Sequence, residues 1–71
     1  MDYASAKEIT EAAFECYRRL NKSLLYVQEN SDEASFKAYR TGVSKVLLEI
    51  LLIINPILAE HPVLKPADWE S

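Results

Sequence analysis

The segment Val46–Leu58, VLLEILLIINPIL, constrains the fold more than any other part of the sequence. Ten of its thirteen residues are aliphatic, and only Glu49, Asn55 and Pro56 interrupt them. A chain of 71 residues buries about 60% of the surface that its unfolded form exposes, so an isolated fold of this size is marginal. Disulfides, metals or partners usually supplement such a core, and the single Cys16 cannot form an intrachain disulfide. The segment therefore predicts association.

A first helix is predicted from Ser5 to Glu29. Ser5 followed by Glu8 is a capping-box pattern, in which each side chain accepts a hydrogen bond from a free amide at the start of a helix. From there a stripe of mostly apolar residues recurs at steps of three and four, which is typical of a helix packed lengthwise on another. The stripe contains Ile9, Ala13, Cys16, Leu20, Ser23 and Val27, and Ala12, Tyr17 and Leu24 widen it.

A second helix is predicted to follow after a very short connection. Asn30 tolerates a left-handed C-terminal position, and Ser31 is a suitable N-cap for a helix with acidic residues in its first turn. A short connection makes the two helices antiparallel neighbours. The first apolar row of the second helix contains Phe36, Tyr39, Val43, Val46, Ile50, Ile53 and Ile57, and a second row contains Leu47, Leu51, Ile54 and Leu58. We assign the first row to the hairpin and the second row to a partner.

Two residues interrupt the second helix. Gly42 costs about 1 kcal/mol relative to alanine in a helix interior. Because the apolar stripe keeps its phase through Gly42, we expect one helix over about 31–55, and the alternative is a three-helix bundle broken near Gly42. Pro56 stops the helix, or kinks it if it runs on to residue 60. The tail, 61–71, either docks on the helices or extends away from them. We expect a single domain over residues 1–71.

The sequence contains no pattern typical of catalysis, cofactor binding or metal binding, so we expect a protein that is not an enzyme and has no cofactor. Glu49 is interpreted as solvent-facing, because burial of an unpaired charge costs several kcal/mol. His61 is the only histidine and lacks companions for a zinc site. Cys16 is interpreted as a small core residue.

The charges are unevenly distributed along a chain of net charge −3. The middle of the chain is basic and both ends are acidic, so the folded hairpin should carry a basic belt. Single-stranded RNA can bind to cations that lie beside tyrosines. The acidic net charge instead favours a belt that is simply exposed to solvent. The candidate anion or RNA belt contains Arg18, Arg19, Lys22, Lys37, Arg40 and Lys45.

Three aromatic residues are left unexplained by the helical stripes: Tyr3, Tyr26 and Trp69 are candidates for a partner-facing surface. A membrane span needs about 20 apolar residues, so the shorter segment Val46–Leu58 predicts no membrane crossing. The N-terminus lacks the pattern of a signal peptide, and with one cysteine we expect a cytoplasmic protein.

The sequence therefore predicts an all-α protein: an antiparallel hairpin of two long helices with a short tail, dimerising into a four-helix bundle. In architecture, the two helices resemble the Rop-type RNA-binding regulators of plasmid copy number, without a specific shared motif. We expect a small non-enzymatic protein-interaction module, such as an adaptor, regulator or inhibitor, and the alternative is a Rop-like RNA-binding regulator. The expected self-association residues are Val46, Leu47, Ile50, Leu51, Ile53, Ile54, Ile57 and Leu58.

Overall fold

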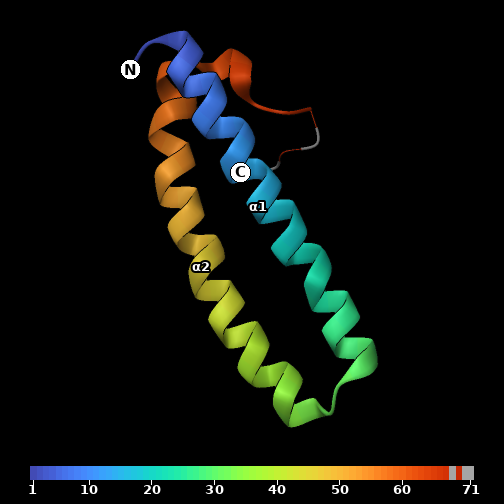
Figure 1. Ribbon diagram of the computed structural model, residues 1–71. Helices are drawn as coiled ribbons and strands as arrows, with labels where there is room; N and C mark the ends of the chain where they lie inside the picture. Colours follow the sequence, from blue (N-terminus) through green and yellow to red (C-terminus); the bar gives the residue numbers. More distant parts are fainter. Residues whose placement is uncertain (68, 70–71) are drawn as a thin grey trace.

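The computed structural model describes residues 1–67 and residue 69. These residues form an antiparallel pair of helices, α1 (Tyr3–Asn30) and α2 (Glu33–Glu60), followed by a single 3₁₀ turn, η1 (Pro62–Leu64) (Figure 1). The hairpin is a rod of 45 × 18 × 18 Å with both helices along its whole length. The expected all-α helical hairpin is confirmed.

Helix α1 begins two residues before the predicted start. Its N-cap is Asp2, and Ser5 lies inside the first turn, so the predicted capping role of Ser5 is wrong. Aspartate and serine are comparable N-caps, and the earlier residue takes the position. A hydrogen bond with Ser5 lowers the pKa of the Asp2 carboxyl, which keeps a negative charge beside the helix N-terminus.

The turn between the helices also differs from the expectation by one residue. The predicted N-cap of the second helix, Ser31, is the extended residue that ends α1, and Asp32 caps α2 by accepting a hydrogen bond from the Ser35 amide at 2.6 Å. The predicted left-handed position at Asn30 is wrong, since none of the described residues has a positive φ angle. Asn30 instead stays helical, and its side-chain amide donates to the carbonyl of Tyr26 at 2.8 Å.

Helix α2 is continuous, which excludes the three-helix alternative. Gly42 lies within the helix, and a Cβ atom added there would meet no described atom within 4 Å, so Gly42 marks neither a break nor a close helix crossing. Pro56 also lies within the helix, which ends at Glu60. The sequence predicts that the second helix ends near residue 55 or continues to residue 60, and the ending at residue 60 is correct.

The buried core between α1 and α2 is thin. Ala6, Phe14, Val43 and Ile54 are the buried apolar side chains among the described residues, and Thr10 is buried with them. Its hydroxyl has no hydrogen-bond partner in the described part of the chain. A core of this size leaves most of the aliphatic content of α2 at the surface.

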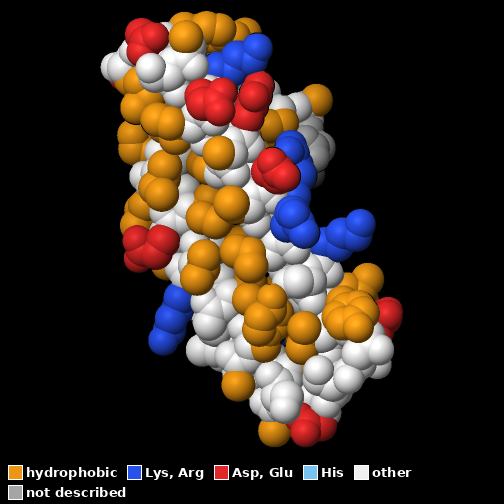
Figure 2. Space-filling model, in the orientation of Figure 1, with side chains coloured by type: hydrophobic (Ala, Val, Ile, Leu, Met, Phe, Trp, Pro, Cys, Tyr) orange, Lys and Arg blue, Asp and Glu red, His pale blue; other side chains and the backbone are white. Residues whose placement is uncertain are grey.

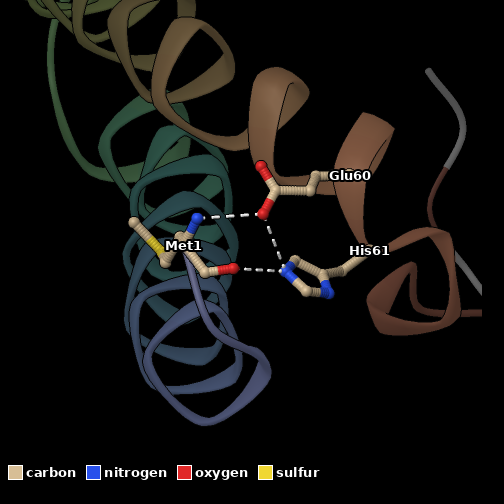
Figure 3. Close-up of polar contacts among 3 residues, drawn as sticks. All are labelled: Met1, Glu60 and His61. Atoms are coloured by element: carbon tan, nitrogen blue, oxygen red, sulfur yellow. Dashed lines mark hydrogen bonds and ion pairs between the residues drawn. The ribbon is translucent and has the colours of Figure 1, made fainter.

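The N-terminus and the end of α2 meet at the end of the rod away from the turn (Figure 3). The Met1 ammonium group donates to Glu60 Oε1 at 2.9 Å, and His61 Nε2 lies 2.9 Å from the Met1 carbonyl oxygen and 3.3 Å from Glu60 Oε1. Because a carbonyl oxygen can only accept, Nε2 carries the hydrogen. Glu60 raises the pKa of the Met1 amine, and the ammonium group lowers the pKa of Glu60.

Candidate interaction surface

The structure does not divide the two apolar rows of α2 between hairpin and partner in the way predicted. Ile54 of the second row is 0% exposed, and Leu47, Leu51 and Leu58 of the same row are half-buried. In contrast, Val46 and Ile53 of the first row are 47% and 53% exposed. The second row therefore packs within the hairpin, whereas the first row from Val46 onward is mixed, with Val46 and Ile53 exposed and Ile50 and Ile57 half-buried.

The stripe predicted on α1 is displaced in the same way. Phe14, which the predicted stripe omits, is buried, whereas Ile9 is 38% exposed and Cys16 is exposed. The prediction that Cys16 lies in the core is therefore wrong. The helix is rotated from its predicted setting because Ala6, Thr10 and Phe14, with Tyr17 and Leu24 beside them, follow an equally regular spacing toward α2.

The displaced residues of both helices lie on one side of the hairpin. In a helix each residue turns about 100°, which places Ser23 on the same side of α1 as Ile9 and Cys16, and Tyr39 on the same side of α2 as Val46 and Ile53. The Ser23 and Tyr39 hydroxyls are joined by a hydrogen bond of 2.6 Å, so the two sides are continuous. We call this surface the open face; it contains Ile9, Ala13, Cys16, Leu20, Val46, Ile50, Ile53 and Ile57.

The tail covers the opposite side of the hairpin. Trp69 packs edge-on against Phe14, with ring centroids 4.5 Å apart, and against Tyr17 at 4.9 Å. The indole nitrogen is buried, so Trp69 belongs to the intrachain packing and its predicted role in a partner-facing surface is wrong. Of the two alternatives for the tail, docking is correct at Trp69. Tyr3 and Tyr26 are exposed, as a partner-facing role requires.

A further pair of apolar residues lies on the side of α2 that points away from α1. Leu48 and Leu52 are 59% and 61% exposed, and we call them the outer strip. Figure 2 shows the result: hydrophobic side chains gather along α2 and over the line between the two helices, broken by few charges.

The exposed surface is larger than that of a compact protein of the same mass. The chain has an accessible surface of 5232 Å², whereas a compact monomer of 8.1 kDa is expected to have about 4,500 Å². The radius of gyration is 14.2 Å, compared with about 11 Å for a compact domain of this length. The excess of about 700 Å² is close to the roughly 800 Å² that each partner buries in a standard protein interface.

The basic residues of the predicted belt come from both helices. Arg18 stacks over the Phe14 ring at 5.6 Å on α1, and Arg40 stacks over the Phe36 ring at 5.7 Å on α2. Lys37 lies 3.7 Å from Glu33 on its own helix. From the helical periodicity Lys45 points away from α1, and the belt as a whole stays a prediction.

The residues considered for chemistry are also dispersed. Glu49 is exposed, as expected, and His61 contacts Glu60 and the N-terminus. Within residues 1–67 and 69, no group of three histidine, cysteine or acidic residues is placed to hold a metal ion. A groove of about 770 Å³ lies between α1 and the tail, lined by Thr10, Phe14 and Leu64 among others, and it holds no arrangement typical of catalysis.

Helix α2 also meets the length and composition of a membrane-spanning helix. The core helix of a soluble protein passes the same test, so this observation alone does not distinguish a bilayer from a protein partner. The expectation of no membrane crossing rests on the thirteen residues Val46–Leu58, whereas the helix that contains them spans Glu33–Glu60.

Comparison with known proteins gives no relative: no family model, no curated protein and no solved structure matches the chain.

Proposed function

We propose that this chain is a non-enzymatic helical interaction module that acts as a homodimer, in which the open faces of two hairpins form the centre of a four-helix bundle. The single observation that carries the proposal is the open face itself, where Ile9, Cys16, Val46 and Ile53 are exposed in the single hairpin and Ala13, Leu20, Ile50 and Ile57 are half-buried. Hydrophobic burial is the main favourable term in association, so this face is the part of the surface that gains most from a partner.

A second copy suits the open face in extent and composition. The excess surface of the monomer is close to one partner's share of a standard interface. Homodimers are the commonest oligomers and use the same patch on both subunits. A bilayer suits α2 less well, because Lys45 and Glu49 lie within its apolar part and each charge at the centre of a bilayer costs at least about 2.5 kcal/mol.

The test is a matched pair of neighbouring substitutions, Ile53→Lys on the open face and Leu52→Lys on the outer strip. The two residues are similarly exposed in the single chain, at 53% and 61%, so neither substitution buries a charge in the hairpin. Both variants gain the same charge and the same side chain. Sedimentation equilibrium is measured for each from low to high micromolar concentration, with helix content followed by circular dichroism.

The proposal predicts a dimer for wild type and for Leu52→Lys, and a helical monomer or a much weaker dimer for Ile53→Lys. A monomeric wild-type protein at high micromolar concentration would contradict it, and so would a dimer that only Leu52→Lys dissociates. Flotation with lipid vesicles is the second measurement. Wild-type chains that float with the vesicles as monomers would assign the apolar surface of α2 to a bilayer and overturn the proposal.

A further inference from the structure

The open face has a direction along the rod, because six of its eight residues lie in the half nearer the termini, and Leu20 and Val46 lie near the middle. Residues of α1 and α2 whose numbers add to about 62 lie level, as the Ser23–Tyr39 and Met1–His61 contacts show. In the half nearer the turn, the same side of the hairpin carries the Ser23 and Tyr39 hydroxyls, hydrogen-bonded to each other. Two copies therefore bury the most apolar surface when their terminal halves are level.

The two helices also contribute side chains of different size to the open face. Helix α1 presents Ala13 and Cys16 near its centre, whereas α2 presents Ile50 and Val46 at the same height. Well-packed helix interfaces place large residues against small ones. The open face therefore packs best when α1 of one copy lies against α2 of the other.

From these two properties we infer that the hairpins of the proposed dimer pair in the same direction, with both turns at one end and α1 of each copy against α2 of its partner. A two-fold axis along the rod produces this arrangement and keeps all neighbouring helices antiparallel. A two-fold axis across the rod would place α1 on α1 and α2 on α2, so that Ala13 and Cys16 of one copy no longer lie against Ile50 and Val46 of the other. It would also place apolar halves against turn halves, or leave half of each rod unpaired.

This inference rests on the proposed homodimer, and a distance between the two turns tests both. Ser31, an exposed residue at the turn, is replaced with cysteine in a Cys16→Ala background, and a nitroxide is attached there. Dipolar coupling between the two labels is measured by pulsed electron paramagnetic resonance. In the same-direction dimer the turns lie side by side, within about 20 Å, two helix spacings apart. In an opposite-direction dimer they are separated by about the 45 Å length of the rod, or more if the rods overlap only in part.

The controls are mixing with excess unlabelled chain, which should abolish the coupling, and the Ile53→Lys and Leu52→Lys substitutions in the labelled protein. We expect one short distance that Ile53→Lys removes and Leu52→Lys preserves. A distance of about 45 Å or longer would overturn the same-direction arrangement and leave the homodimer intact. No coupling at concentrations where the label is fully incorporated would overturn the homodimer and the inference together.

Discussion

Replacing Ile54 with alanine tests which apolar row of α2 holds the hairpin together. Ile54 is 0% exposed, so the substitution removes about three buried carbon groups, worth about 2.4 kcal/mol in transfer free energy, and leaves a cavity. Isoleucine-to-alanine changes in cores cost about 2–5 kcal/mol, against a total stability of about 4–10 kcal/mol for 71 residues. At about 4–8 °C per kcal/mol, the melting temperature should fall by about 10 °C or more.

The matched control is Ile53→Ala, the neighbouring residue of the other row, which changes helix propensity by the same amount. Thermal unfolding is followed by circular dichroism at two protein concentrations about a hundredfold apart. Ile54→Ala should lower the melting temperature at both concentrations, whereas Ile53→Ala should mainly reduce the rise in melting temperature that concentration produces, because it weakens association. Equal losses from the two substitutions at low concentration would refute the assignment of the rows.

Three further predictions concern single residues. Gly42→Ala should raise the melting temperature by a few degrees, because the added methyl group has open space and alanine is favoured over glycine in a helix by about 1 kcal/mol; a fall would show that the helix needs glycine there. Unfolding at varied pH should show stability lost below about pH 4.5 as Asp2, Asp32 and Glu60 protonate through their lowered pKa values, and lost above about pH 8.0 as the Met1 amine deprotonates through its raised pKa. Glu60→Gln should flatten the alkaline part of that profile, and an unchanged slope would exclude the contact with Met1. The Cys16 thiol should react with a thiol reagent more slowly as protein concentration rises, and a rate independent of concentration would place Cys16 outside any interface.

The hairpin could be predicted because the signals that specify it are local. Asn30, Ser31 and Asp32 interrupt two long periodic segments, and a short connection between long helices leaves only an antiparallel arrangement. The exact caps were displaced by one to three residues, because aspartate and serine serve equally well and several of them lie close together. Continuity through Gly42 followed from the unbroken phase of the stripe, whereas continuity through Pro56 depends on packing around it.

The assignment of the apolar rows could not be predicted from periodicity. Ile53 and Ile54 are equally hydrophobic and differ in orientation by about 100°, so the pattern identifies two apolar directions on α2 without saying which one faces α1. The same ambiguity on α1 led to the choice of Cys16 over Phe14. The Phe14–Trp69 contact resolves the ambiguity on α1. This contact joins residues from opposite ends of the sequence, so no local sequence pattern predicts it.

The Ser23–Tyr39 hydrogen bond has a consequence for the uniqueness of the fold. Because α2 carries two aliphatic rows, turning it about its own axis by one residue would exchange them at little hydrophobic cost. The rotated helix would carry the Tyr39 hydroxyl away from Ser23 and leave a part-buried pair of hydroxyls without each other. One polar contact between the helices, worth about 1 kcal/mol in stability, thus discriminates between two packings that hydrophobicity treats as nearly equal. The contact thereby fixes which side of α2 faces α1 and which side stays open to a partner.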